Sequence, residues 1–348
     1  MAVAFSTCPQ LVSPLPIPAR NATHRCSVRA SANFPGSSSS SSSTSVNAVG
    51  TEETSPGLSP PPGFNPPQPK RFAVRPDKLL DILGASLALP FRLGTGVFVS
   101  GYSASLVSEA DIPPGQYALG IAGFKVKETS KLGPRPEKPI EIYEFESCPF
   151  CRKVREMASI LDLDVLYYPC PRNGPNFRPK VLQMGGKQQY PYMVDPNTGV
   201  SMYESDEIIK YLVQKYGNGS VPLMLSLGVI TTLTEGFAMI GRMGKARDLF
   251  SPICCLGSFY TPAKVPQEPL QLWAYEGSPF CKIVREVLVE LELPHLLHSI
   301  ARGSPKRQEF YERIGHFQVP YLEDPNTGVK MFESAEIVDY LRTTYALA

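Results

Sequence analysis

Glu146-Ser147-Cys148-Pro149-Phe150-Cys151 is the stretch that decides the fold of this 348-residue chain. It places a Cys-x-x-Cys pair between an apolar run at 140–145 and a helical pattern over 152–161. A strand, a two-cysteine turn and a helix in this order predict a dithiol redox site. We expect Cys148 to be the exposed nucleophile, because the free N–H groups and positive dipole end of a helix favour a thiolate there. Cys151, one turn further along, is expected to be the resolving thiol.

Three cations follow the cysteines closely, namely Arg152, Lys153 and Arg155. Their positive field would lower the pKa of Cys148, although solvent screens part of it. In the alternative interpretation these side chains only solvate the helix. Two unreactive structural thiols are the alternative for the cysteines themselves, and the strand–turn–helix context favours the redox interpretation.

A second copy of this pattern begins 130 residues later, with Ser278-Pro279-Phe280-Cys281 in place of the Cys-x-x-Cys. The shift aligns Glu146 with Glu276 and Arg155 with Arg285. After a one-residue deletion, the six residues 195–200 recur identically as 324–329. An internal repeat of this kind predicts two domains of the same fold.

Hydrophobic periodicity predicts the elements of the first copy. They are strands at 140–145 and 164–168, helices at 149–161 and 176–184, a hairpin of 192–195 with 200–203, and a closing helix at 205–216. The predicted fold class is therefore α/β, with the order β-α-β-α-β-β-α in each copy.

The remaining chain divides by composition. Arg20, Arg25 and Arg29 with a run of seven serines and no acidic residue before Glu52 predict a plastid transit peptide, cut near residue 30. An ordinary disordered tail is the alternative. The expected divisions are 1–51 transit peptide, 52–72 proline-rich linker, 73–134 apolar region without assigned chemistry, 135–217 first domain, 218–265 helical connector and 266–348 second domain.

Two apolar stretches are candidates for contact with a membrane. Neither 93–108 nor 223–233 offers the run of about 20 apolar residues that a spanning helix needs. We expect packed helices here, with a membrane-surface contact through 73–110 or 221–241 as the alternative.

The net charge and the number of cysteines narrow the range of possible functions further. A net charge of +2 gives no electrostatic case for nucleic acid. Eight cysteines in a chain of this length do not predict a disulfide framework. No second Cys-x-x-Cys completes a zinc set, so we expect no metal, and Cys170 and the pair Cys254-Cys255 are interpreted as structural.

Each copy resembles the thioredoxin-fold N-terminal domain of the glutathione S-transferase superfamily and is similar to glutaredoxins. The resemblance rests on Cys148-Pro149-Phe150-Cys151, Tyr190-Pro191-Tyr192 and Glu204-Ser205-Asp206, and on Ser278-Pro279-Phe280-Cys281, Val319-Pro320-Tyr321 and Glu333-Ser334. The Cys-Pro-Phe-Cys form also resembles the membrane-associated prostaglandin E synthase type 2 group. The presequence and the tandem arrangement resemble a plant chloroplast protein of the thioredoxin superfamily.

The resemblance implies a glutathione site. Pro191 and Pro320 would follow cis peptide bonds, which leaves the preceding backbone, at Tyr190 or Val319, to pair with glutathione. Ser205 would bind the γ-glutamyl carboxylate, and Glu204 or Asp206 would accept from the ammonium group. Ser205 and Ser334 acting only as helix caps is the alternative, and both roles are compatible.

The second copy departs from the pattern. A hydroxyl cannot form a disulfide, so Ser278 excludes a two-thiol cycle there, and Cys281 is expected to be buried. Ser278 would either bond a glutathione thiolate or belong to a domain kept for packing or binding. We favour the second, because Val319 and Ala335 stand where the first copy has Tyr190 and Asp206.

The predicted function is a chloroplast, glutathione-linked thiol–disulfide oxidoreductase that acts on disulfide or glutathionylated proteins, in the stroma or at a membrane. A glutathione-dependent transferase or isomerase is the first alternative. It is disfavoured because only 217–265 could supply the helical domain that binds an electrophile. A non-catalytic scaffold at a membrane surface is the second alternative.

Overall fold

The computed structural model describes residues 58–70, 73–239, 242 and 259–347. The compact unit Thr54–Ala348 contains all of them. The predicted transit peptide with Cys8 and Cys26, the linker residues 52–57 and 71–72, and the Cys254-Cys255 pair lie outside the described residues.

The first repeat has the predicted β-α-β-α-β-β-α order. Its elements are β4 (Ile140–Glu144), α3 (Pro149–Ile160), β5 (Val165–Pro169), α4 (Phe177–Gly185), β6 (Tyr192–Asp195), β7 (Val200–Met202) and α5 (Ser205–Tyr216). Each bound lies within one residue of its predicted position, because apolar periodicity marks these elements locally.

The second repeat has the same order. It contains β8 (Leu270–Ala274), α8 (Pro279–Glu290), β9 (His295–Ser299), α9 (Lys306–Ile314), β10 (Tyr321–Asp324), β11 (Val329–Met331) and α10 (Ser334–Tyr345). Helix α3 packs against α5, and α8 packs against α10. The predicted fold class, two tandem thioredoxin-fold domains, is therefore confirmed.

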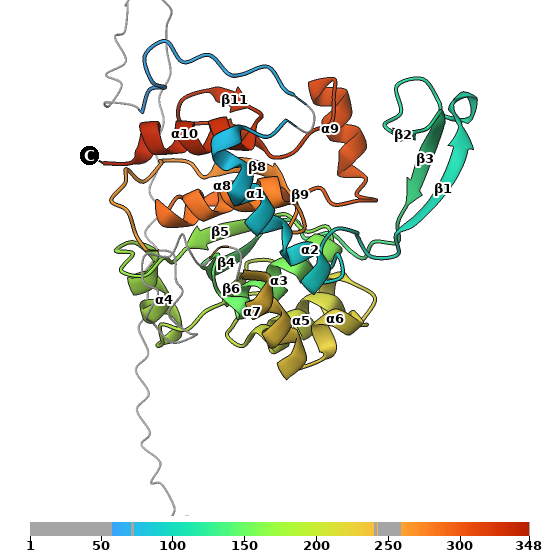
Figure 1. Ribbon diagram of the computed structural model, residues 1–348. Helices are drawn as coiled ribbons and strands as arrows, with labels where there is room; N and C mark the ends of the chain where they lie inside the picture. The colour runs from blue at the N-terminus through green and yellow to red at the C-terminus, as the bar shows by residue number, and fades with distance from the viewer. Residues whose placement is uncertain (1–57, 71–72, 240–241, 243–258, 348) are drawn as a thin grey trace, which may run out of the picture. The chain divides into compact units, whose positions relative to one another are not determined.

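The two repeats share one sheet, which the sequence did not predict. Eight strands run in the order β11-β10-β8-β9-β5-β4-β6-β7 (Figure 1). The join is an antiparallel pair of β5 with β9, in which Val165 faces Leu297 and Tyr167 faces His295. The rings of Tyr167 and His295 stack with centroids 5.5 Å apart. Each repeat thereby covers the edge strand that the other would expose.

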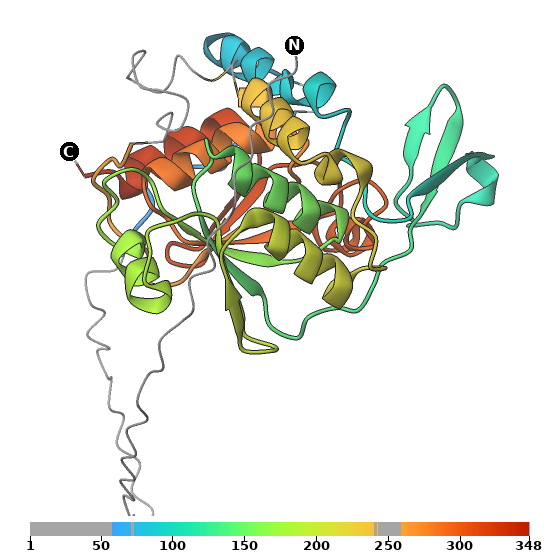
Figure 2. The same cartoon turned by 90° about the horizontal axis from the view of Figure 1, so that it is seen from below.

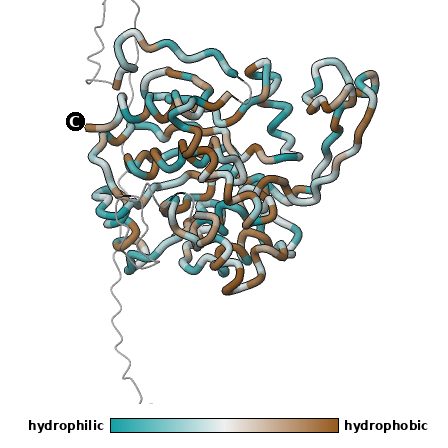
Figure 3. The backbone as a smooth tube through the Cα atoms, viewed as in Figure 1, coloured by the Kyte–Doolittle hydropathy of each residue, from teal (hydrophilic) through white to brown (hydrophobic). Residues whose placement is uncertain are grey.

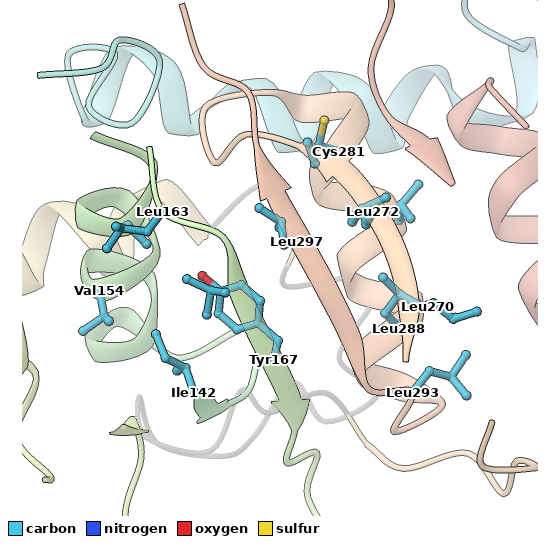
Figure 4. Close-up of a cluster of buried hydrophobic side chains, with 14 of the residues drawn as sticks. Ile142, Val154, Leu163, Tyr167, Leu270, Leu272, Cys281, Leu288, Leu293 and Leu297 are labelled. Atoms are coloured by element: carbon cyan, nitrogen blue, oxygen red, sulfur yellow. The ribbon is translucent and has the colours of Figure 1, made fainter. Parts of the chain in front are cut away.

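A single hydrophobic core runs across this join. Ile142, Val154 and Tyr167 of the first repeat belong to the same buried cluster as Leu272 and Leu297 of the second (Figure 4). The two repeats therefore pack as halves of one compact body and are not separate domains joined only by a linker.

A buried network of ion pairs lies where the two Cys-x-x-Cys-type turns meet. The guanidinium of Arg155 on α3 lies 3.0 Å from Glu276, and that of Arg285 on α8 lies 3.2 Å from Glu146. Each arginine also bonds the glutamate of its own repeat, with Arg155 3.3 Å from Glu146 and Arg285 2.9 Å from Glu276. The four side chains are almost fully buried, so each charge depends on partners from both repeats.

Helices outside the repeats extend this network. These are η1 (Pro76–Lys78), α1 (Leu79–Ser86), α2 (Ala88–Phe91), α6 (Leu223–Ser226) and α7 (Val229–Met239). Arg92, directly after α2, lies 2.7 Å from Glu156 of α3 and 2.9 Å from Glu235 of α7. Figure 2 shows α1, α2 and α7 beside the helices of the repeats, where α7 packs against α2 and α3 and α1 packs against α8.

The region 73–134, for which we assigned no chemistry, also holds a small separate sheet. Strands β1 (Ser103–Ser108), β3 (Phe124–Thr129) and β2 (Leu119–Ile121) pair in that order, and η2 (Glu109–Asp111) follows β1. We call 103–129 the ribbon. Within the described residues, no helix is long and apolar enough to cross a bilayer.

Replacing Arg285 with Met should lower the free energy of unfolding by about 3–5 kcal/mol, because Glu146 and Glu276 lose a buried partner. Urea unfolding of wild type and variant measures the change. Lys210→Met is the control, since the pair of Lys210 with Glu207 is exposed and should leave stability unchanged. A loss below about 1 kcal/mol for Arg285→Met would show that the network does not hold the repeats together.

Candidate redox and glutathione site

Cys148 caps the N-terminus of α3. Its backbone is extended (φ −92°), Pro149 begins the helix, and the Cys151 N–H donates to the Cys148 sulfur over 3.3 Å. Contrary to our expectation of an exposed nucleophile, Cys148 is only 5% exposed. The cause lies in the preceding turn, because Glu146 is drawn into the ion network and carries the turn inward with it.

The two thiols have opposite pKa shifts. Burial opposes ionisation of Cys148, but hydrogen bonds from the side chain and backbone of Cys151 outweigh it and hold the pKa of Cys148 below its usual value. Burial and the neighbouring Cys148 raise the pKa of Cys151 well above its usual value. The proton therefore leaves Cys148 first, which is the order that a nucleophile followed by a resolving thiol requires.

The neighbouring cations are not among the largest causes of this pKa shift, and the alternative interpretation, that they only solvate the helix, was wrong. Arg152, Lys153 and Arg155 are buried, so they do not solvate the helix. Arg152 lies 2.9 Å from Glu235, Lys153 lies 2.5 Å from Asp206, and Arg155 bonds the carboxylates described above together with Glu144. The carboxylates cancel the positive field, and the charge of Glu144 raises the pKa of Cys148.

The loop before β6 and the start of α5 lie in the same repeat as the cysteines. The Tyr190–Pro191 peptide bond is cis, as the resemblance implied. Glu204 precedes α5 with a left-handed backbone (φ 64°) and accepts a hydrogen bond of 2.5 Å from Gln189 Nε2. Ser205 is the first residue of α5 and is buried.

The capping interpretation of the serines needs correction. Glu204 and Glu333 occupy the N-cap positions of α5 and α10, and neither side chain caps its helix. Ser205 and Ser334 are the first helical residues, where backbone N–H groups have no partner within the helix. Such N–H groups favour an anionic ligand.

The ion pair of Lys153 and Asp206 links α3 to α5. Asp206 is exposed, so its carboxylate faces both Lys153 and solvent. A ligand ammonium group at Asp206 would share the carboxylate with Lys153. Glu204, which accepts only an amide hydrogen bond in the described residues, is the freer acceptor of the two.

Sequence reasoning missed Arg178 on α4. Its Nε donates to the Pro171 carbonyl over 2.5 Å, and its guanidinium lies 5.0 Å from the centre of the Tyr190 ring. Arg307 on α9 makes the same bond, to the Ala301 carbonyl over 2.9 Å. Arg178 and Arg307 are 129 residues apart, the same spacing as Pro191 and Pro320, so the repeat alignment could have revealed them.

The second repeat keeps the geometry of the site without its thiol. The Cys281 N–H donates to Ser278 Oγ over 3.3 Å, as the Cys151 N–H does to Cys148. The Val319–Pro320 bond is cis, and Glu333 accepts 2.8 Å from Gln318 Nε2 and 2.5 Å from the Lys70 N–H. Cys281 is fully buried, and burial raises its pKa.

A search of the described residues for metal ligands finds no group of three or more His, Cys, Asp or Glu side chains that could hold an ion. Two histidines serve other purposes. His295 stacks on Tyr167 at the join of the sheet, and His298 bonds Asp164 over 2.9 Å.

Comparison with known proteins identifies the repeats. Residues 142–220 and 272–348 each match the family described as glutathione S-transferase, N-terminal domain. Each repeat is therefore similar to this domain. Among curated proteins, it is 30% identical over 78 residues to the glutathione S-transferase-like protein tpcF of Aspergillus fumigatus, which covers 22% of this chain and 34% of the relative. It is 32% identical over 80 residues to gedE of Aspergillus terreus, also glutathione S-transferase-like, over 23% of this chain and 35% of the relative.

The comparison with solved structures returns glutathione transferases. The Bombyx mori glutathione transferase BmGSTD1 is 34% identical and covers 24% of this chain and 38% of its own, with a TM-score of 0.22. A further structure of that transferase is a complex with GTT. The chain spans about a third of the length of the curated relatives that it matches.

Proposed function

We propose that the first glutathione S-transferase N-terminal domain is a glutathione-linked thiol–disulfide oxidoreductase. The observation that carries the proposal is the position of Cys148 at the N-cap of α3, where its sulfur accepts a hydrogen bond from the Cys151 N–H over 3.3 Å. The pKa shifts agree with this geometry, because the pKa of Cys148 is lowered and that of Cys151 is raised. A lowered pKa supplies the attacking thiolate, and a raised pKa keeps the second thiol protonated until it is needed.

The reaction takes two exchanges. The Cys148 thiolate attacks the glutathione sulfur of a glutathionylated protein, a Cys148–glutathione disulfide forms, and the protein thiolate leaves and takes up a proton. Cys151 then loses its proton and attacks the Cys148 sulfur, which releases glutathione and leaves a Cys148–Cys151 disulfide. Two glutathione molecules reduce this disulfide and leave as glutathione disulfide, which restores both thiols.

The surrounding groups suit glutathione. The backbone at Tyr190, before the cis Pro191, can pair with the cysteinyl residue. The N–H of Ser205 at the start of α5 can hold the γ-glutamyl carboxylate, and Glu204 can accept from the ammonium group. Arg178, which makes no ion pair within the described part of the chain, can take the glycyl carboxylate.

Replacing Cys148 with Ser should reduce the release of glutathione from a glutathionylated peptide to the uncatalysed background, because the thiolate is lost. Cys151→Ser should instead accumulate the Cys148–glutathione disulfide, visible by mass spectrometry of the intact protein. Cys170→Ser is the matched control, since burial raises the pKa of that thiol too and it takes no part in the reaction.

Two outcomes would contradict this proposal. Cys148→Ser could release glutathione as fast as wild type, which would remove Cys148 from the reaction. Alternatively, the wild-type protein could fail to release glutathione from the peptide and instead conjugate glutathione to 1-chloro-2,4-dinitrobenzene. Cys151→Ser would then conjugate at the same rate as wild type. That pattern would support the transferase function that the names of the relatives suggest.

We also propose that the protein works in the plastid, at a membrane surface. The location rests on the composition of 1–51. The membrane contact rests on exposed apolar residues along α1, α2, α6 and α7, and Figure 3 colours hydrophobic residues brown along these segments. The alternative prediction of a membrane-surface contact named the segments 73–110 and 221–241, and these meet there, with the centres of the Phe91 and Phe237 rings 6.0 Å apart. Leu80 of the first segment is 81% exposed.

We call the exposed side chains Leu80, Leu83, Phe91, Val229, Ile230, Leu233 and Phe237 the apolar face. No element of the described structure covers them. Side chains of this kind on adjacent helices can enter the headgroup region of a bilayer without spanning it.

After import into isolated chloroplasts, the wild-type protein should sediment with membranes and be released by a carbonate wash. The double variant Leu80→Ser, Leu233→Ser should move to the stroma, because it removes two side chains from the apolar face. The control Leu106→Ser, Phe124→Ser removes exposed apolar side chains from the ribbon and should leave the distribution unchanged. A wild-type protein found wholly in the stroma would contradict the membrane contact, and a failure to import would contradict the location.

A further inference from the structure

The second repeat contains a cavity at the position of its implied glutathione site, since Val319, Glu333 and Ser334 are part of the lining. It has a volume of about 610 Å³ and lies over Ser278 and the cis Pro320. The ribbon supplies the opposite wall, through residues 116–120 and Lys125. Nothing in the proposed redox reaction of the first repeat uses this cavity.

The ribbon wall is fixed to α9 by specific hydrogen bonds. The Tyr117 N–H donates to Gln308 Oε1 over 2.6 Å, and Gln308 Nε2 donates to the Gly115 carbonyl over 3.1 Å. Arg302 lies 2.9 Å from Glu128 of β3. The two walls therefore form one built site, in which the ribbon keeps its place without a ligand.

Arg307 is a buried cation in this cavity, and an anionic ligand would balance its charge. It is 4% exposed, and its Nε donates to the Ile300 and Ala301 carbonyls over 3.2 and 2.9 Å. Its Nη1 lies 3.3 Å from the Tyr117 hydroxyl. Arg307 forms no ion pair with any described residue, and the carboxylate of Glu128, which acts on it electrostatically, is already paired with Arg302. A buried cation without a counter-charge in direct contact is costly.

The other basic residues of the lining add to this positive field, whereas Glu333 opposes it and Glu128 offsets the charge of Arg302. The cavity is lined by four basic residues and one acidic residue, Glu333. Glu333 already accepts two hydrogen bonds, from the Lys70 N–H and from Gln318. Within the part of the chain that the structure describes, Lys125 forms one ion pair, with Glu109, which is 74% exposed at its side chain and so contributes little.

Aromatic side chains form much of the remaining surface. Five rings line the cavity, from Tyr117, Tyr275, Phe280, Tyr311 and Phe317. The centres of the Tyr117 and Phe317 rings are 4.8 Å apart, and the Arg307 guanidinium lies 4.4 Å over Phe317. The fixed cation thus stands beside flat apolar surface, which suits a ligand with an anionic group next to a ring.

We propose that this cavity binds a small organic anion that carries a planar aromatic group. The anionic group lies against Arg307 and Lys125, and the ring lies between the ribbon and the second repeat. Ser278 faces the same cavity and has no thiol, so the site binds its ligand without exchanging disulfides. The second repeat is then a binding domain, and the first repeat carries the redox chemistry.

Isothermal titration calorimetry of the full chain with naphthalene-2-sulfonate tests the proposal. We expect one site, and about tenfold weaker binding for Arg307→Gln and for Lys125→Gln, since each removes a charge-assisted contact. Lys127→Gln is the matched control, because Lys127 is an exposed residue of the same strand as Lys125, lies outside the lining of the cavity and should leave binding unchanged. The neutral 2-(methylsulfonyl)naphthalene should bind at least about tenfold more weakly than the sulfonate.

Several results would overturn the proposal. They are absence of binding, equal affinity for the neutral compound, an equal loss in Lys127→Gln, or tighter binding of glutathione than of the sulfonate. Circular dichroism checks that Arg307→Gln is folded. If it is not, Lys125→Gln decides, because Lys125 lies on the ribbon and outside the core of the repeat. The readout is binding alone, so the result is independent of the redox function.

Discussion

The reciprocal ion pairs of Arg155 with Glu276 and Arg285 with Glu146 are the constraint on which the rest of the structure depends. Each turn before a Cys-x-x-Cys-type helix sends its glutamate to the arginine of the other repeat. Burying these charges is costly, and the cost is offset only when both repeats are in place with good geometry. The pairs therefore fix how the repeats meet, and the β5–β9 join of the sheet follows the same approximate symmetry.

This constraint shapes the candidate active site. Because Glu146 is held inside, the turn that carries Cys148 is also drawn in, and the sulfur is nearly buried. The cations around it are neutralised by carboxylates, so the electrostatic field that usually activates such a cysteine is largely cancelled. The stabilisation of the Cys148 thiolate that remains is local, since the N–H and side chain of Cys151 act on it across one helical turn. The reactivity of Cys148 therefore depends on the Cys-x-x-Cys turn itself, and the surrounding charges hold the two repeats together.

The local parts of this arrangement could be predicted from the sequence, and the long-range parts could not. Apolar periodicity marks each element of the first repeat to within a residue, and the internal repeat in the sequence predicted the duplicated domain that the family matches at 142–220 and 272–348 bear out. The partner of an edge strand leaves no such local signal, so the β5–β9 pair was missed. Arg152 and Arg155 look like solvent-facing charges on a helix, and only the packing of α2, α7 and the second repeat shows that they are buried. The left-handed backbone of Glu204 was missed for a similar reason, because glutamate has no special preference for that conformation.

The alkylation of Cys148 as a function of pH tests the central claim most directly. The fully reduced chain is treated with iodoacetamide at a series of pH values, and peptide mass spectrometry follows each cysteine separately. The account predicts a midpoint for Cys148 below about 8.5, the value of an unperturbed thiol, because its pKa is lowered, and a midpoint for Cys151 above it. A midpoint for Cys148 at or above that value, or the same midpoint for both cysteines, would contradict it.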